Sequence, residues 1–223
     1  MAMTELLIVS RYDGVQSVAQ EVEEKSEVKH RTLKKLPKAL SPQQVDQLLS
    51  KISLKCPTSK RNMAIFQTML KAGLRVSEVC NLTPADVNLE KGNIYVQCGK
   101  GQKDRMLPIG QCLMNWLKKW DSIRPQQSQY FFCTLQGGQL DPRYLNQVLE
   151  RLSVKSGVFI QDRLKQGPVH CHCLRHTYAT DLLRRGLNLP QIQKLMGHAS
   201  IATTQVYLYV SDEELDAAVK ALG

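Results

Sequence analysis

The stretch that decides the fold is HCLRHTYATDLLRRG, residues 172–186. From Leu174 onward it predicts a helix, and Gly186 provides the stop that commonly ends one. Polar groups crowd its start, where His172, Arg175 and His176 stand within two turns. The packing of a helical domain does not require these groups, so the stretch predicts a helix that also carries chemistry.

Outward from this helix, the chain predicts a mainly α domain with a small antiparallel β-sheet. Ser41 and Gln44 form a capping-box pattern around Pro42. Asp141 precedes Pro142 in the same way. Further helices are expected at 60–73, 77–82, 111–120, from 142 on, at 189–197, 201–209 and 212–222. Segments 93–98 and 104–109 flank GKGQK and predict a β-hairpin.

Composition and charge favour a soluble protein with a polyanionic partner. The 223 residues are 43% hydrophobic and 22% charged, with a net charge of +10. Residues 1–28 hold six acidic and two basic residues, which leaves +14 for residues 29–223. Such a positive field suits nucleic acid, although a basic surface alone is equally consistent with simple solubility.

The cysteines and apolar runs predict a reducing compartment. Seven cysteines are scattered through the chain, and an odd, irregular set is typical of free thiols. The early apolar run at 6–9 is too short for a signal peptide, and no run approaches a bilayer span. We therefore expect a cytoplasmic protein.

Four polar clusters contain the candidate site residues. Each has an ordinary explanation: Arg75 could pair with Glu78, Lys100 could be a solvated turn lysine, and Tyr207 could be a core tyrosine. His172 and His176 could likewise be a packed pair. The full candidate set is Arg75, Lys100, His172, Arg175, His198 and Tyr207.

Taken together, these side chains suit reaction at a phosphodiester. Arginine forks match non-bridging phosphate oxygens, and imidazoles can assist in offsetting the charge that develops during phosphoryl transfer. A tyrosine hydroxyl is a nucleophile that leaves a reversible phosphoester. A lysine beside the leaving oxygen can act as general acid.

The segments GLRVSE, GKGQKDRMLPI, HCLRHTYAT and GHASIATTQVY resemble the signature boxes of the tyrosine recombinase, or phage integrase, family. Xer-type resolvases and transposon integrases are the nearest in pattern. The resemblance runs from about residue 36 to 218. It implies the catalytic-domain fold of DNA breaking-rejoining enzymes, with residues 1–33 as an acidic extension and basic linker and 34–223 as the catalytic domain.

The resemblance also implies a role for each candidate. Arg75 and Arg175 match the phosphate-binding arginines, with Glu78 as companion of the first. Lys100 matches the general acid, with Lys103 as fallback. Tyr207 matches the nucleophile, and Tyr209 is its nearby competitor. His172 and His198 match the catalytic histidines, and His176 matches a supporting one.

A metal site is the competing reading of HCHCLRH, residues 170–176. It is disfavoured because zinc sites usually need a second, distant ligand pair, and because Arg175 would repel a cation. The family chemistry uses no cofactor, since the bond energy is stored in the phosphotyrosine.

The resemblance implies site-specific DNA recombination by a tetramer on paired DNA sites. One departure is that only about 35 residues precede the catalytic region, too few for the family's amino-terminal clamp domain. A non-catalytic DNA-binding relative, or a modulator of another recombinase, therefore stays open. Residues 212–222 form an amphipathic pattern that could dock into a neighbouring subunit or onto its own core.

Overall fold

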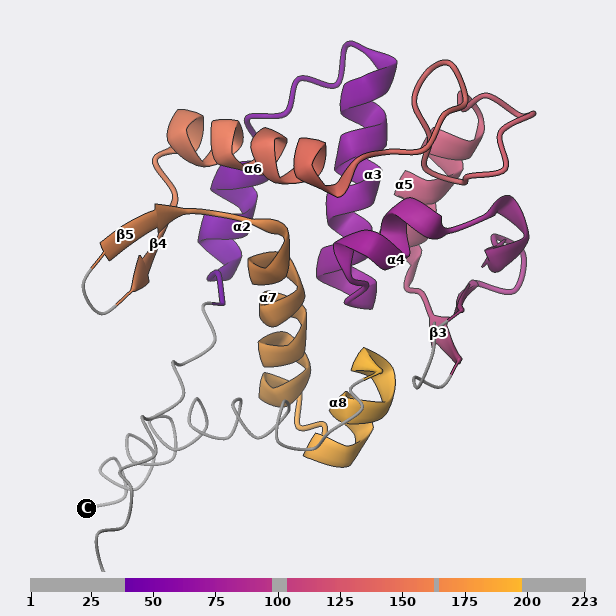
Figure 1. The fold of residues 1–223 in the computed structure, drawn as a ribbon. Helices are drawn as coiled ribbons and strands as arrows, with labels where there is room; N and C mark the ends of the chain where they lie inside the picture. Colours follow the sequence, from indigo (N-terminus) through magenta and orange to yellow (C-terminus); the bar gives the residue numbers. More distant parts are fainter. Residues whose placement is uncertain (1–38, 98–103, 163–164, 198–223) are drawn as a thin grey trace, which may run out of the picture. The chain divides into compact units, whose positions relative to one another are not determined.

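The computed structural model describes residues 39–97, 104–162 and 165–197. In this part of the chain the fold is mainly α, as predicted, with two small antiparallel sheets (Figure 1). The helices are α2 Pro42–Leu49, α3 Pro57–Ala72, α4 Val76–Asn81, α5 Gln111–Asp121, α6 Pro142–Ser156, α7 Cys171–Arg184 and α8 Leu189–Met196, with a 3₁₀ turn at Pro84–Asp86. The strands are β1 Val87–Asn88, β2 Asn93–Val96, β3 Arg105–Pro108, β4 Phe159–Asp162 and β5 Lys165–Pro168.

The predicted helix caps are confirmed. Ser41 Oγ accepts from the Gln44 backbone, and the Gln44 side chain accepts from the Ser41 N–H. Asp141 accepts from the Arg143 backbone at the start of α6. Helix α3 ends, as expected, at Gly73, which has a φ of 66°. The predicted helices at 201–209 and 212–222 lie outside the described residues.

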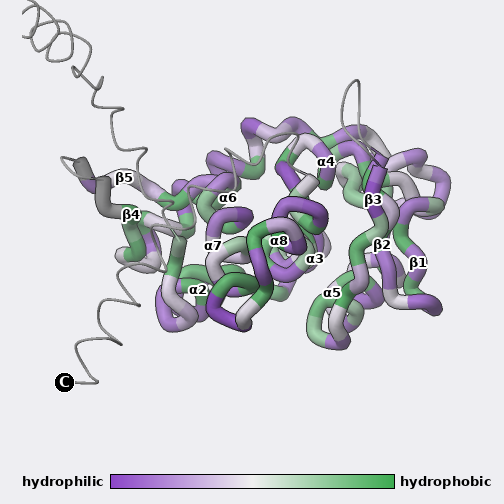
Figure 2. Tube along the Cα trace, turned by 90° about the horizontal axis from the view of Figure 1, so that it is seen from below, coloured by the Kyte–Doolittle hydropathy of each residue, from purple (hydrophilic) through white to green (hydrophobic). Residues whose placement is uncertain are grey.

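The predicted hairpin is present, and β1 extends it to a three-stranded sheet in the order β1-β2-β3. Tyr95 is paired with Met106, and Val96 with Arg105. The glycine-bearing turn lies outside the described residues. The second hairpin, β4–β5, was not predicted from the sequence. Both drawings place the two sheets at opposite ends of this domain, with α3, α7 and α8 between them (Figures 1 and 2).

Helix α3 is the centre of the core. Ten of its 16 residues are buried, and it packs against α5 and α7. Trp120 of α5 is fully buried, and its indole N–H donates to the Phe131 carbonyl at 2.8 Å. None of the described helices is long and apolar enough to span a bilayer.

A smaller apolar cluster fixes α8 against α7. Tyr178 and Ala179 of α7 pack with Ile192 and Met196 of α8. Burying a side chain such as Ile192 or Met196 is worth roughly 1.5–3 kcal/mol. This packing holds the end of α8 beside the loop that follows α3.

Candidate active site

Half of the predicted site residues lie in the described part of the chain. Arg75 is the residue just before α4, and Arg175 lies in the second turn of α7. The structure brings these two together. His172 is exposed at the start of α7. The remaining three, Lys100, His198 and Tyr207, lie outside the described residues, as does Lys103.

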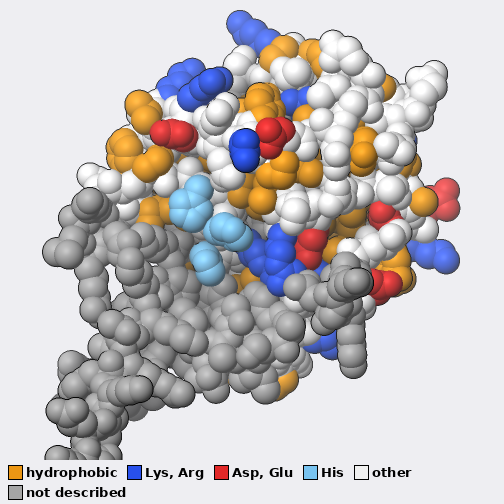
Figure 3. Space-filling view, in the orientation of Figure 1, with side chains coloured by type: hydrophobic (Ala, Val, Ile, Leu, Met, Phe, Trp, Pro, Cys, Tyr) orange, Lys and Arg blue, Asp and Glu red, His pale blue; other side chains and the backbone are white. Residues whose placement is uncertain are grey.

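Three histidines lie together on the surface, beside a patch of Lys and Arg side chains (Figure 3). The His170 and His172 ring centroids are 6.2 Å apart in an edge-to-face arrangement. Burial lowers the pKa of His176 to about 4, and the charges of His172 and Arg175 act in the same direction. His176 is therefore a neutral imidazole at physiological pH.

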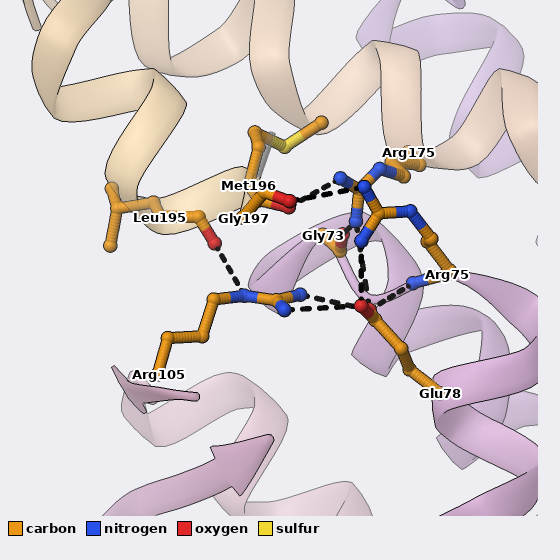
Figure 4. Close-up of polar contacts among 8 residues, drawn as sticks. All are labelled: Gly73, Arg75, Glu78, Arg105, Arg175, Leu195, Met196 and Gly197. Atoms are coloured by element: carbon orange, nitrogen blue, oxygen red, sulfur yellow. Dashed lines mark hydrogen bonds and ion pairs between the residues drawn. The ribbon is translucent and has the colours of Figure 1, made fainter. Parts of the chain in front are cut away.

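Glu78 is the centre of an arginine cluster (Figure 4). Arg75 donates to Glu78 twice, from its backbone N–H to Oε2 at 2.7 Å and from Nη1 to Oε1 at 2.8 Å. Arg105 donates through both terminal nitrogens, at 3.0 and 2.8 Å. Arg175 Nη1 completes the cluster with an ion pair to Glu78 Oε2 at 3.7 Å. One carboxylate thus orients guanidinium groups from α7, β3 and the loop before α4.

The electrostatics of the cluster favour an anion. Burial by itself would raise the pKa of Glu78, but the hydrogen bond and charge of Arg105 outweigh it and lower the pKa to about 2. The backbone N–H of Arg75 and the charge of Arg175 also lower it. Glu78 is therefore ionised, and the three guanidinium groups and one carboxylate together carry a charge of +2.

At the end of α8, the carbonyls of Leu195, Met196 and the capping residue Gly197 each accept a hydrogen bond from a different arginine (Figure 4). A helix leaves these carbonyls without intrahelical partners, and its C-terminal end carries a partial negative charge. The end of α8 is therefore a favourable binding position for cations. The bonds are Arg105 Nε to Leu195 O at 2.9 Å, Arg175 Nη2 to Met196 O at 2.5 Å and Arg75 Nη2 to Gly197 O at 3.1 Å.

Two glycines make this close approach possible. Gly197 has a φ of 63°, and a Cβ added there would lie 2.7 Å from Arg105 Nη1. Gly73 has a φ of 66°, and a Cβ there would lie 2.2 Å from the Tyr178 ring. The Gly73 carbonyl also accepts from Arg175 Nη1. Both positions therefore need glycine for its backbone conformation and for its missing side chain.

Sequence reasoning missed Arg105 as a member of this site. Arg105 lies inside the box GKGQKDRMLPI, whose predicted site residue was the turn lysine Lys100. A signal was present, because in an alternating strand Arg105 shares a face with Leu107, and both are buried, whereas Met106 and Pro108 are exposed. An arginine on the core face of a strand needs buried partners, which here are Glu78 and the end of α8.

The HCHCLRH segment is split between two environments. Cys171 and Cys173 are buried in the core, whereas His172 between them is exposed. Burial raises the pKa of Cys171 to about 12. Within residues 39–97, 104–162 and 165–197, no three His, Cys, Asp or Glu side chains are grouped so that they could hold a metal ion.

The arrangement is suited to a phosphate diester. Arg75 is the most accessible of the three arginines, with a quarter of its side chain exposed, and Arg105 and Arg175 are buried behind it. Fixed guanidinium groups of this kind neutralise non-bridging phosphate oxygens without reorganising during reaction.

Comparisons with known proteins agree with this reading. Residues 38–214 match the phage integrase family. The tyrosine recombinase XerA of Thermococcus kodakarensis is 39% identical over 183 residues, which is 81% of this chain and 61% of that protein. The crystal structure of XerA recombinase superposes with a TM-score of 0.70 at 31% identity, covering 83% of this chain and 65% of that one.

A second solved structure, XerH site-specific recombinase bound to palindromic difH substrate in a post-cleavage complex, has a TM-score of 0.68 at 29% identity. It covers 83% of this chain and 53% of that one. The chain thus spans about three fifths of the length of the curated relatives that it matches. Because the family match covers most of the chain and the folds agree, the chain belongs to the phage integrase family and has a Xer-like tyrosine recombinase catalytic domain.

Proposed function

We propose that this protein is a site-specific recombinase that cuts and rejoins DNA strands through a covalent link to Tyr207. The single observation that carries the proposal is the Glu78-centred cluster of Arg75 and Arg175 at the end of α8. The residue after this helix end is His198, and Tyr207 follows nine residues later in the sequence. Family membership supports the same chemistry.

In the proposed reaction, the Tyr207 hydroxyl oxygen attacks the scissile phosphorus. A bond forms from phosphorus to the phenolic oxygen, and the bond from phosphorus to the 5′ oxygen breaks. Lys100 gives a proton to the departing 5′ oxygen, and we assign His172 as the acceptor of the phenolic proton. The reverse attack by a 5′ hydroxyl from a second strand restores the phosphodiester.

Arg75 and Arg175 would bind the non-bridging oxygens and stabilise the charge that develops in the transition state. Each well-placed donor of this kind is worth on the order of 3 kcal/mol. His198 would add a further hydrogen bond to the same phosphate. The roles of Lys100, His198 and Tyr207 rest on their match to the family boxes, because these residues lie outside the described part of the chain.

The proposed partner is double-stranded DNA, cut at paired sites by a tetramer of this or related chains. The XerH structure bound to difH substrate supports a DNA partner by similarity. We also propose that residues 34–223 form the catalytic domain and that residues 1–33 are an extension. We further propose a reducing, cytoplasmic setting, which the odd number and scattered spacing of the seven cysteines support.

The proposal is tested with a nicked DNA substrate on which cleavage releases a short fragment and traps the protein–DNA adduct. We expect a covalent adduct for the full chain and none for Tyr207→Phe. Tyr209→Phe is the matched control and should keep the adduct. An adduct that persists in Tyr207→Phe and disappears in Tyr209→Phe would move the nucleophile to Tyr209.

The general acid is tested by changing the leaving group. Lys100→Ala should slow cleavage of the normal substrate and recover on a substrate with a 5′-bridging sulfur, since a thiolate leaves without a proton. Lys103→Ala is the control. Recovery seen only for Lys103→Ala would transfer the role to that lysine.

The alternative, a relative that binds DNA without cutting it, predicts a different result. It would bind DNA with an affinity that falls steeply as salt rises, and it would form no adduct at any protein concentration. That outcome would overturn the recombinase proposal.

A further inference from the structure

Arg105 joins three segments that carry proposed site residues. Its guanidinium group bonds Glu78, which holds Arg75 and Arg175, and it bonds the carbonyl of Leu195, three residues before His198. Its own strand, β3, starts five residues after Lys100. We propose that Arg105 is a positioning residue that sets the two phosphate-binding arginines through Glu78 and the end of α8. This inference rests on the proposed function.

The geometry gives Arg105 an indirect role. All three of its side-chain nitrogens donate to protein acceptors at 2.8–3.0 Å, and only 6% of the side chain is exposed. Arg75 differs, because a quarter of its side chain reaches solvent. Arg105 therefore acts through its neighbours, and Arg75 is the group that can face an incoming phosphate.

Arg105 also limits how tightly Glu78 holds the other two arginines. Both carboxylate oxygens are shared, since Oε1 accepts from Arg75 and Arg105, and Oε2 lies 2.8 Å from Arg105 Nη2 but 3.7 Å from Arg175 Nη1. Without Arg105, Glu78 would be free to pair more closely with Arg75 and Arg175. Glu78 would then neutralise more of the positive charge of Arg75 and Arg175, and less of that charge would be available to stabilise the phosphate.

A second effect acts on α8. Arg105 Nε donates to the Leu195 carbonyl at 2.9 Å, and Gly197 packs against the Arg105 guanidinium group so closely that a methyl group could not fit. Removing the arginine leaves this carbonyl and the helix end without that support. The helix end also receives Arg75 and Arg175, so its displacement would move both.

Lysine cannot reproduce this arrangement. Arg105 binds the carboxylate through two parallel N–H groups and the carbonyl through a third, in one plane. A lysine ammonium is a point charge on a flexible stem and lacks this fork. Arg105→Lys should therefore keep the charge and the fold but lose much of the positioning.

The test measures adduct formation by the full chain on nicked DNA, with Arg105→Gln and Arg105→Lys. The matched control is Arg124→Gln, because Arg124 is equally buried, with 7% of its side chain exposed, and pairs with Asp121 outside the site. We expect a rate about 100-fold lower for Arg105→Gln, the size that a small misplacement of reacting groups can cause. Arg105→Lys should be intermediate, Arg124→Gln close to wild type, and DNA affinity unchanged for all three.

A second substrate separates positioning from general loss of structure. In a methylphosphonate, one non-bridging oxygen is replaced by a methyl group, so the neutral centre needs less from the arginines. The deficit of Arg105→Gln relative to wild type should shrink to about tenfold or less on this substrate. A merely structural defect would lower the rate of adduct formation by the same factor on both substrates. Glu78→Gln should likewise reduce the effect of Arg105→Gln, because the two residues act as a unit.

Three outcomes are distinguishable. If the wild-type chain forms no adduct, the proposed function fails. If wild type reacts and folded Arg105→Gln and Arg105→Lys match it, or if their deficits are the same on both substrates, the role of Arg105 is overturned. If Arg105→Gln does not fold, as judged by circular dichroism, Arg105→Lys on the two substrates decides the question.

Discussion

Replacing Glu78 by Gln keeps the shape of the side chain and removes the negative charge that three arginines share. The fall in the Glu78 pKa from 4.5 to about 2 corresponds to about 3 kcal/mol of stabilisation at neutral pH. The side chain is only 10% exposed, so solvent screens this energy little. Glu78→Gln should therefore lower the free energy of unfolding at pH 7 by about 3 kcal/mol, consistent with the cost of breaking a buried ion pair.

The pH dependence follows from the sign of the shift. The folded-state pKa is lowered, so the stabilisation is complete above the ordinary pKa of 4.5 and is lost as pH falls through about 2. By pH 3 the difference between wild type and Glu78→Gln should have shrunk by about 2 kcal/mol. Other carboxylates titrate in both proteins, so the difference isolates Glu78.

The assay is urea unfolding at pH 7 and pH 3, followed by circular dichroism. Asp121→Asn is the control, since Asp121 pairs with Arg124 at 2.7 Å but is 37% exposed. An exposed pair contributes at most about 1 kcal/mol, so this variant should show a small and nearly constant difference. A Glu78→Gln difference of equal size at both pH values would refute the electrostatic account of the cluster.

Three further predictions concern the end of α8, the buried histidine of α7 and the cap of α2. Gly197→Ala should lower the free energy of unfolding by about 1–2 kcal/mol because of the positive φ alone, and by more because of the clash with Arg105. Urea unfolding measures this loss, and a variant as stable as wild type would contradict the close contact between Gly197 and Arg105. The His176 imidazole resonances should not titrate between pH 8 and 5.5, because its pKa is about 4, and an NMR midpoint near 6.5 would contradict its burial. Ser41→Ala should lower the free energy of unfolding by about 1 kcal/mol with adduct formation unchanged, while Ser41→Asp should retain the cap.

Local sequence signals predicted the elements well where capping chemistry is explicit. Ser41, Asp141, Gly73 and Gly197 marked helix ends that the structure confirms. The β4–β5 hairpin was missed because its strands, Phe159–Asp162 and Lys165–Pro168, are short and mostly polar and lack a simple alternating apolar pattern. Its pairing depends on long-range packing that periodicity does not report.

For the site, the sequence predicted which residue types matter but not how they are held. Arg75, Glu78 and Arg175 were all identified, and the structure brings them together. Arg105 was overlooked, because its importance comes from two contacts far away in the sequence, to Glu78 and to Leu195. The hydrogen bonds from these arginines to the carbonyls at the end of a helix likewise cannot be predicted from residue spacing in the sequence.

The charge of the Glu78 cluster has a consequence for the stability of the domain itself. Three cations gathered around one anion repel one another, and the single carboxylate of Glu78 offsets only part of their charge. A phosphate placed at Arg75 would relieve part of that repulsion and would complete the charge balance of the cluster. Binding of a phosphate at Arg75 should therefore raise the free energy of unfolding of the domain.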